Sequence, residues 1–448
     1  MKIRFFFLFA CLTPVAAYAQ HAYLGIQNST RKSMVSVMMN PAEINNFERK
    51  LEVNFVSVNA LFLNNVLSLS EIAGTEGSVW QHMMEKANGP VNGDSHGSVL
   101  MPSFGVNLGK WSLGWANQFN SRGSILQVNP SIGSNITKTS NSEGSTTIRL
   151  ENHHNQRVNG VMWIESGVVV GREILNNNKV KLSLGTNLKL LIPINYTNAG
   201  LSQLQGTLIL RDGEAILSDA SGVFHLAYNR NLVDAKHLRL DYGNLELKTP
   251  NSFGLDLGAN FQAKQAGKVW LNAGASINNI GQLNFEVGNT SNYLRMNIPH
   301  GHEVSLDLLH PSLERTVEQL VGTGYFTADR TVEGFSVGLP TTFSLYSDFR
   351  VYDRFFVSLF WQQLLKDQEE NFQVPFVGVF AITPSMQFGK FEVFSPWSYL
   401  EISHLVGGIG LRYGGFFLSS QTVLTALFAD YGTADAQVGF SWGFGNKR

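Results

Sequence analysis

The sequence predicts an all-β fold, a transmembrane antiparallel β-barrel of about 14 strands with an N-terminal plug segment and long extracellular loops. Three observations support this prediction. Apolar and polar residues alternate in one segment after another, charged residues make up only 15% of the chain, and the chain begins with the features of a bacterial export signal. Alternating strands in an exported protein of low charge are typical of a barrel in an outer membrane.

The clearest alternation runs from Lys179 to Ile192. A period of two indicates a β-strand, because successive side chains point to opposite faces of a sheet. One face carries Val180, Leu182, Leu184, Leu188, Leu190 and Ile192, and the other carries Lys181, Ser183, Gly185, Asn187 and Lys189. We therefore expect one face toward lipid and the other toward the lumen.

The composition favours a membrane protein over a soluble β-protein. Charged residues, at 15%, fall below the ~25% of an ordinary soluble domain, and glycine, at 43 of 448 residues, exceeds the usual ~7%. A soluble protein of this size needs a charged surface, whereas a barrel presents an apolar band to lipid and uses glycine where strands bend or the lumen is crowded. After the first residues, no uninterrupted apolar run reaches the ~18 residues of a helical span.

Residues 1–19 are expected to be a signal peptide. Lys2 and Arg4 precede an apolar run over 5–12, and Ala17-Tyr18-Ala19 supplies small residues for cleavage after Ala19. A short membrane anchor is the first alternative, but the run is shorter than the ~20 residues of a spanning helix. A lipoprotein signal ending at Cys11 is the second, and the bulky Phe9 fits it poorly.

The mature chain is expected to contain no cysteine. Cys11 is the only one in the sequence, so its removal excludes disulfides, thiolate metal sites and a cysteine nucleophile. Removing Lys2 and Arg4 leaves 31 of the 33 basic residues against 34 acidic ones, a net charge near −3. Nothing in this balance suggests nucleic acid as a partner.

Residues 20–50 are predicted to form the hatch or plug. This stretch is polar and irregular and contains Met39-Asn40-Pro41-Ala42. Pro41 has no amide hydrogen for a strand ladder and disfavours helix at Asn40, so we expect a turn or plug element rather than wall. Residues 51–448 are expected to form the barrel.

The expected elements follow in chain order. Residues 64–100 are interpreted as a long loop with a short helix at 78–85, residues 201–248 as a folded loop or as wall strands with extensions, and residues 285–330 as a second long loop with a helix from about 310 to 320. Strands are predicted at 52–60, 104–110, 111–119, 158–171, 179–192, 252–262, 269–278, 341–351, 354–362, 374–383, 386–394, 404–413, 415–423 and 436–444.

The lengths of the connections predict the orientation. Short links such as Tyr352-Asp353 and Pro384-Ser385 are expected to face the periplasm, and the long breaks near 64–100, 200–250 and 285–330 the outside. This asymmetry predicts the outer membrane of a Gram-negative bacterium, with membrane lipid as a partner. The tryptophans Trp111, Trp163, Trp270, Trp361 and Trp442 are interpreted as members of interfacial aromatic belts.

No catalytic, cofactor or metal site is predicted. His300-Gly301-His302-Glu303 contains possible ligands for zinc or copper, but a solvated loop explains it better. Neither a Gly-x-Ser-x-Gly turn nor a helical metal motif occurs, so an enzyme is not expected. Predicted lumen positions are mostly Gly, Ser, Asn and Gln with few aligned charges, which favours a narrow or plugged barrel over a porin.

Two sets of residues carry a resemblance to known families. Met39-Asn40-Pro41-Ala42 resembles the Asn-Pro-Ala element of the FadL-type barrels, which take up hydrophobic compounds. Much of the mature chain also resembles an uncharacterised outer-membrane family of Bacteroidota related to those barrels, a family with no established substrate. The similar pieces are residues 252–258, 277–281 and 339–345.

The resemblance implies that Asn40, Pro41 and Ala42 lie in the hatch and that apolar cargo leaves sideways through a gap in the wall. The chain departs from the expected pattern at its end, where four residues follow Phe444. The first functional hypothesis is a barrel that binds or transports hydrophobic small molecules in its lumen. The second is a scaffold or docking barrel for a secretion or surface-assembly machine, with proteins of that machine as partners.

Overall fold

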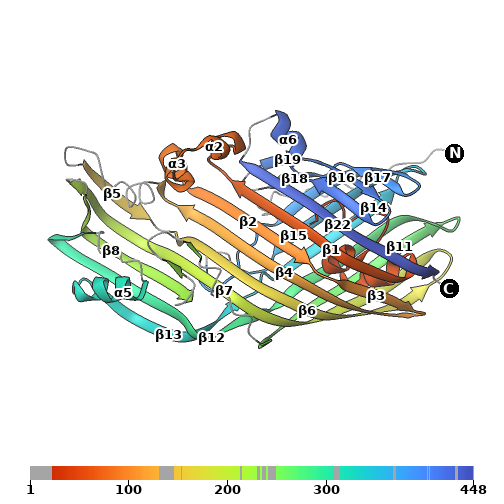
Figure 1. The fold of residues 1–448 in the computed structure, drawn as a ribbon, viewed down its shortest axis with the longest axis horizontal. Helices are drawn as coiled ribbons and strands as arrows, with labels where there is room; N and C mark the ends of the chain where they lie inside the picture. Colours follow the sequence, from red (N-terminus) through yellow and green to blue (C-terminus); the bar gives the residue numbers. More distant parts are fainter. Residues whose placement is uncertain are drawn as a thin grey trace.

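The computed structural model describes residues 23–130, 146–152, 154–211, 214–229, 233–234, 239–240, 249–305, 313–366, 370–400, 402, 404–428 and 432–446. Within these ranges, one antiparallel sheet of 20 strands closes on itself, and a separate two-stranded sheet lies beside it. Figure 1 shows the tilted strands wrapping around one long axis. The predicted signal peptide lies outside the described residues.

The strands of the large sheet are β1 (Arg49–Asn64), β2 (Val91–Leu100), β3 (Ser103–Leu108), β4 (Trp111–Val128), β5 (Thr146–Asn152), β6 (Gln156–Asn176), β7 (Val180–Arg211), β8 (Glu214–Asn229), β11 (Ser252–Gln265), β12 (Lys268–Ser305), β13 (Phe326–Gly338), β14 (Thr342–Arg350), β15 (Phe355–Leu364), β16 (Val379–Phe388), β17 (Phe391–Phe394), β18 (Trp397–Leu400), β19 (His404–Gly407), β20 (Ile409–Tyr413), β21 (Phe416–Ser420) and β22 (Thr433–Asn446). The two-stranded sheet consists of β9 (Val233–Asp234) and β10 (Arg239–Leu240). The helices are α1 (Met34–Met39), the 3-10 helix η1 (Pro41–Asn46), α2 (Leu69–Gly74), α3 (Val79–Lys86), α5 (Leu313–Gly322) and α6 (Val423–Phe428).

The first and last strands of the wall close the ring. β1 pairs with β22 along its length, from Arg49 opposite Asn446 to Leu63 opposite Thr433. On its other side β1 pairs with β2 and β3, and the ring continues through β4, β6, β7, β11, β12, β14, β15 and β16 to β17–β22. Closure removes the exposed edges that an open sheet would leave.

The predicted fold class is confirmed, and the strand number stays a prediction. Some strands are interrupted, as where β2 ends at Leu100 and β3 begins at Ser103. Others lie beside extensions of the wall strands rather than in the ring itself. The expected count of about 14 therefore depends on which pieces are counted together.

Two long strands carry a lobe at the loop end of the barrel. β7 has 32 residues and β12 has 38, whereas a strand needs about 10 residues to cross a bilayer. β5, β8 and β13 pair with these extensions, and Figure 1 shows them with α5 at the end opposite β3 and β11. The lobe has its own buried apolar cluster, formed by Leu150, Leu204, Leu208, Ala215, Leu217, Ala220, Leu294, Met296, Ile298, Val304, Leu320 and Phe326.

The two faces of the wall differ as the alternation predicts. On β7, Leu184, Leu188 and Leu190 are 48%, 57% and 43% exposed, whereas Lys181 and Lys189 are buried. The exposed face of the ring is apolar over β3, β4, β11, β16 and β20–β22. Such an arrangement suits lipid outside and polar contacts inside. Trp163 is the exception among the predicted belt tryptophans, because it is 2% exposed and points inward.

Two connections differ from their predicted positions. Residues 91–100, predicted to be loop, form β2 and pair with both β1 and β4. Pro384-Ser385, predicted to be a turn, lies inside β16, and the turn falls at Gly389-Lys390. Pro384 is tolerated there because it lies opposite the break between β17 and β18, where an amide hydrogen is not required.

The helices are short, and several of them begin with a side-chain cap. The predicted helix at 78–85 is α3, whose first turn is capped by the Ser78 hydroxyl, and α2 begins with a capping box between Ser68 and Glu71. The predicted helix at 310–320 is α5 from Leu313 onward, and residues 310–312 lie outside the described residues. In the described part of the chain, no helix combines the length and apolarity that crossing a bilayer requires.

Candidate functional site

Residues 23–47, here called the N-terminal segment, make contacts on opposite sides of the ring. Its side chains reach β1, β11, β12, β14, β17 and β20, and η1 packs against β3, β4, β6 and β7. Strands this far apart around a closed wall can be reached together only from inside it. The segment is almost wholly buried, so it fills the part of the lumen near the β3 and β11 end.

The predicted hatch residues lie at the centre of this segment. The Asn40 side chain caps η1 by accepting a hydrogen bond from the Ala42 amide at 2.9 Å. Its amide group donates to the Ala259 carbonyl at 2.9 Å and to the Tyr346 hydroxyl at 3.3 Å. Pro41 occupies the first position of η1, where its missing amide hydrogen costs nothing.

Glycines in the wall make room for the N-terminal segment. A Cβ at Gly185 would lie 2.4 Å from the Ala42 nitrogen, and a Cβ at Gly258 would overlap the Asn40 side chain. No real Cβ contact is this close, so a larger side chain at either position would displace the segment. The wall and the segment are therefore matched in shape.

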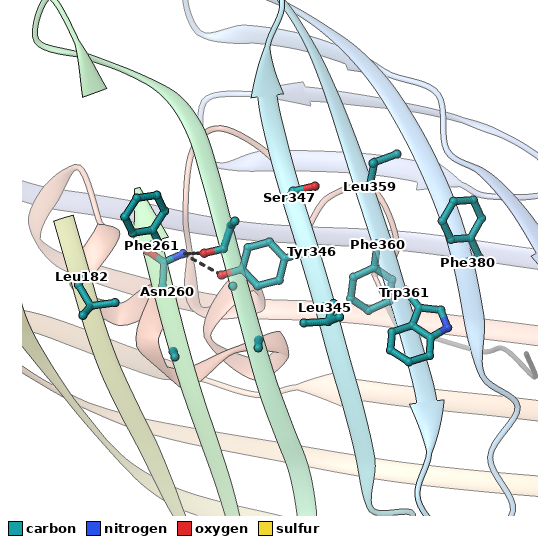
Figure 2. A pocket seen from close by; sticks show the side chains of 14 residues that line it. Leu182, Asn260, Phe261, Leu345, Tyr346, Ser347, Leu359, Phe360, Trp361 and Phe380 are labelled. Atoms are coloured by element: carbon teal, nitrogen blue, oxygen red, sulfur yellow. Dashed lines mark hydrogen bonds between the residues drawn. The ribbon is translucent and has the colours of Figure 1, made fainter. Parts of the chain in front are cut away.

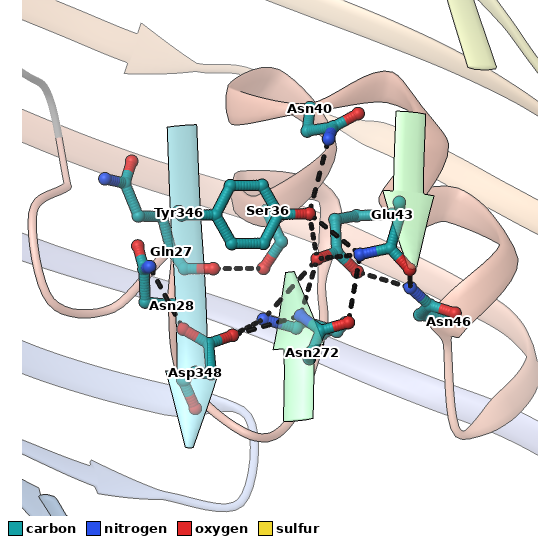
Figure 3. Close-up of polar contacts among 12 residues, drawn as sticks. Gln27, Asn28, Ser36, Asn40, Glu43, Asn46, Asn272, Tyr346 and Asp348 are labelled. Atoms are coloured by element: carbon teal, nitrogen blue, oxygen red, sulfur yellow. Dashed lines mark hydrogen bonds and ion pairs between the residues drawn. The ribbon is translucent and has the colours of Figure 1, made fainter. Parts of the chain in front are cut away.

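A buried ionic network fixes the segment to β14 (Figure 3). The Lys32 ammonium lies 3.0 Å from Asp348 and 3.7 Å from Glu43. The Tyr346 hydroxyl donates to Glu43 at 2.5 Å, and the Asn272 side chain donates to Glu43 and Asp348 at 3.0 Å each. Each charge in this network has an opposite charge or a hydrogen-bond donor beside it, as burial requires.

The same network shifts the pKa values of two residues of the segment. Burial alone would lower the pKa of Lys32, but the carboxylates of Asp348 and Glu43 outweigh it and raise that pKa above its ordinary value. Burial alone would raise the pKa of Glu43, but Lys32 and the surrounding hydrogen bonds outweigh it and lower that pKa. Both groups are therefore charged at neutral pH.

A second polar group fixes the start of the segment to β1, β17 and β20. The Ser29 hydroxyl donates to Glu392 and accepts from the Arg412 guanidinium, both at 2.6 Å. Arg31 pairs with Glu52 at 2.8 Å. The Tyr23 hydroxyl donates to the Ser57 carbonyl at 2.6 Å, and burial raises the pKa of Tyr23 to about 12.

The prediction of few aligned charges in the lumen is wrong. Lys189 lies 2.7 Å from Glu165 and 2.9 Å from Asp256, and all three side chains are buried. Lys181 and Lys189 were correctly assigned to the polar face of their strand. Their partners could not be recognised without the pairing of β6 and β11 with β7, which brings the Glu165 and Asp256 carboxylates to Lys189 and the Glu173 carboxylate to Lys181.

In the part of the chain that the structure describes, strand pairing is interrupted between β7 and β12. Along β7, pairing with β11 extends to Leu191, and pairing with β8 begins at Asn198. Along β12, pairing with β11 extends to Gly281, and pairing with β8 begins at Asn289. Among the described residues, no strand lies between 192–197 of β7 and 282–288 of β12. Asn251 bridges part of this space, because its backbone amide donates to the Leu191 carbonyl at 3.3 Å and its side chain donates to the Asn284 carbonyl at 3.0 Å.

Aromatic side chains cluster beside this interruption, on the lumen side. Tyr196 lies across it from Phe285, with ring centroids 5.9 Å apart, and also contacts Phe335 and Phe372 at 5.7 and 6.3 Å. Tyr196 is fully buried. The surrounding apolar cluster consists of Val161, Trp163, Leu191, Ala227, Leu283, Val337, Leu339 and Val374. We call these residues the aromatic cluster.

A small cavity of about 80 Å³ separates the aromatic cluster from the N-terminal segment. Trp163 and Phe376 line it from one side, and Tyr23, Val35 and Met38 of the segment line it from the other. The cavity also contains polar side chains, among them those of Arg122 and Lys189. The lumen thus contains, in this spatial order, the N-terminal segment, a small amphipathic cavity and the aromatic cluster.

A larger groove of about 490 Å³ lies on the wall and is lined mostly by apolar side chains (Figure 2). Its floor includes the small residues Ala259, Ala273 and Ala275. Large side chains surround them, namely Leu182, Phe261, Leu345, Leu359, Trp361 and Phe380. Because these side chains belong to the exposed face of the strands, the groove faces the surrounding membrane.

The His300–Glu303 motif does not assemble a metal site. His300 Nδ1 lies 2.9 Å from Asp219, His302 Nδ1 lies 2.8 Å from the Tyr325 hydroxyl, and Glu303 pairs with Arg211 at 2.8 Å. The side chains are therefore directed to different partners on the lobe. No group of three or more metal-ligating side chains occurs among the residues that the structure describes. His154 is exposed, and its neighbour 153 lies outside those residues.

These features define a transmembrane β-barrel whose lumen is occupied by its own N-terminal segment. Residues 41–421 match the family described as "Family of unknown function (DUF5723)". The chain belongs to this family, which confirms the resemblance to an uncharacterised barrel family. Among curated proteins, none matches the chain.

Several solved barrels are similar in fold. The toluene transporter TodX of P. putida is 10% identical, with 92% of this chain and 94% of that chain covered and a TM-score of 0.44. A TodX mutant described as a monoaromatic hydrocarbon channel is 10% identical, with coverages of 93% and 96% and a TM-score of 0.48. The translocator domain of the autotransporter NalP from Neisseria meningitidis is 8% identical, with coverages of 91% and 94% and a TM-score of 0.34. These likenesses concern the fold and say nothing of cargo.

Proposed function

We propose that this protein binds hydrophobic small molecules in its lumen and passes them across the outer membrane. The proposal assigns residues 1–19 to an export signal, residues 20–50 to the plug and residues 51–448 to the barrel. Asn40, Pro41 and Ala42 form the hatch. Transport, rather than catalysis, is the activity proposed.

The interrupted wall beside the aromatic cluster is the observation that carries this proposal. An apolar compound entering from the loop end meets buried aromatic and aliphatic side chains, the kind of lining that binds small apolar ligands. Below the cluster, the segment blocks the axis of the barrel with charged and polar groups. Passage of an apolar compound through this region would desolvate these groups, which costs free energy. The interruption offers an exit toward lipid that avoids this polar region.

The experiment measures uptake of a labelled fatty acid into proteoliposomes. The wild-type protein is compared with Tyr196→Ala, which removes the ring that spans the interruption, and with Tyr413→Ala, an exposed aromatic residue on the outer face. We expect uptake by the wild type, a several-fold change in Tyr196→Ala and no change in Tyr413→Ala.

The alternative, a scaffold for a secretion or surface-assembly machine, gives a different result in the same experiment. It predicts no uptake above protein-free liposomes together with co-purification of secretion subunits from the outer membrane. That combination would overturn the transport proposal. Uptake that is equal in all three proteins would also contradict it, because the aromatic cluster would then play no part in the path.

A further inference from the structure

The two ends of the barrel carry opposite charge. At the end with the tight turns, exposed basic residues lie in or beside the turns, and we call the following six the basic rim: Lys110, Arg172, Lys179, Lys268, Arg354 and Lys390. At the loop end, exposed carboxylates predominate among the described residues, including Glu76, Glu85, Glu214, Glu303, Glu318 and Glu333. A separation of this kind favours partners of opposite charge at the two ends.

The basic rim extends over five connections at this end of the barrel. Its residues belong to the connections β3–β4, β6–β7, β11–β12, β14–β15 and β16–β17. Acidic residues at these turns are few and already paired: Asp353 lies 2.8 Å from Lys268, and Glu173 lies 2.7 Å from the buried Lys181. Asp353 also interacts with Arg354. Among the described residues no ion pair involves Lys110, Arg172, Lys179 or Lys390, so their charge is left for a partner outside the chain.

The rim lies at the edge of the apolar face. The Arg172 guanidinium lies 4.8 Å from the centre of the Trp111 ring, and the Arg354 guanidinium lies 5.9 Å from the centre of the Phe388 ring. Both rings belong to the exposed apolar face. Arginine paired with an exposed aromatic ring fits the depth of lipid headgroups, where one end of the pair is apolar and the other is wet.

We propose that the basic rim binds the anionic headgroups of phospholipids in the inner leaflet of the outer membrane. Charge distributed over five connections around the barrel matches an annulus of lipid, whereas a protein partner would need a continuous face at one place. The turns are also too short to project far beyond the bilayer surface. Phosphate oxygens are the acceptors that arginine and lysine bind most readily at such a surface.

The test measures lipid preference in the reconstituted full-length protein. Electron spin resonance of spin-labelled phosphatidylglycerol and spin-labelled phosphatidylcholine, each in phosphatidylcholine vesicles, gives the relative association of the two lipids with the barrel. We expect a several-fold preference for phosphatidylglycerol that weakens at high salt, since rim charges near the surface are screened.

Two matched variants distinguish an effect of the rim charges on lipid preference from an effect of total charge. Lys110→Gln, Arg172→Gln, Lys179→Gln and Lys390→Gln together remove four rim charges and should abolish most of the preference. Arg149→Gln, Arg211→Gln, Arg295→Gln and Arg315→Gln remove four exposed basic charges from the loop end and should leave it intact. The shift of the folded barrel on unheated gels checks that each variant is folded.

Two results would overturn the inference. One is an equal association of the two lipids with the wild type, which would indicate that the rim binds a protein or cell-wall polymer instead of lipid. The other is an equal loss of preference in both sets of variants. The inference concerns the outer rim only, so failure of fatty-acid uptake would leave it untouched.

Discussion

The two halves of the lumen are closed by different forces. Near the tight turns, the N-terminal segment is held by buried ion pairs and hydrogen bonds around Lys32, Glu43 and Asp348. Near the loops, the aromatic cluster is held by packing around Tyr196 and Phe285. Polar closure is directional and fails when one partner is lost, whereas apolar packing adapts to a change in shape. The first half suits a fixed plug, and the second suits a variable ligand.

The largest effect is expected from Lys32→Met. Removing the ammonium leaves the carboxylates of Glu43 and Asp348 buried without their cation, a change that costs about 3–5 kcal/mol. We expect the segment to detach and the permeability of liposomes to small polar dyes to rise. Glu48→Gln is the matched control, because Glu48 lies in the same stretch but is exposed. Equal dye permeability in the two variants would remove the distinction between the two halves.

The next effect is expected from Tyr196→Ala in the aromatic cluster. Truncating a fully buried ring costs about 3 kcal/mol of folding free energy through lost contacts and a new cavity. The temperature of unfolding in detergent should fall, while dye permeability stays at the wild-type value because the plug is intact. A rise in permeability to the level of Lys32→Met would show that the two closures are not separate.

A smaller effect is expected from Gly258→Ala, which adds one methyl group where the Asn40 side chain lies. Overpacking of this kind costs about 1–3 kcal/mol, and the segment can yield in part. We expect a modest rise in dye permeability and faster proteolysis of the segment. Gly97→Ala is the control, since its Cβ would meet only Ser121 at 3.9 Å. If the segment resists proteolysis equally in both variants, the close fit between Gly258 and Asn40 does not help to keep the lumen closed.

The smallest effect is expected from a change of pH, which alters the charges of Glu43 and Lys32 and so the docking of the N-terminal segment. The lowered pKa of Glu43 means that its contribution to docking is complete above the ordinary value of 4.5 and is lost as pH falls through the lowered value. The raised pKa of Lys32 means that its contribution is complete below 10.5 and is lost only as pH rises beyond that. Dye permeability should therefore be flat around neutral pH and rise in strong acid. Glu43→Gln should abolish this acid response.

The wall could be predicted from the sequence because its signal is local. Alternation over residues 179–192 identifies both faces of β7 without knowledge of its neighbours. β2 was missed because Asn92, Gly93 and Gly97 are turn formers, and the pairing with β1 and β4 outweighs their preference. The extension of β7 beyond residue 200 agrees with one of the two alternatives for 201–248. The length of β12 was missed for a similar reason as β2, since β8 and β13 support it from distant parts of the chain.

The candidate site could be predicted only in outline. Asn40, Pro41 and Ala42 were identified by resemblance, but Lys32 and Glu43 carry no local signal. Their partners Asp348 and Asn272 lie 316 and 229 residues further along the chain. The interruption between β7 and β12 depends on where β8 ends and β11 begins relative to these two strands, and no single segment of sequence encodes it.

The most direct test of the plug is the conductance of single barrels in a planar bilayer, for the wild type and for a variant that lacks residues 20–47. This deletion spares β1, which begins at Arg49 and closes the ring. We predict that the wild type is closed and that the variant forms steady open channels. A wild type that conducts as well as the variant would contradict the account, because the N-terminal segment would then leave the lumen open.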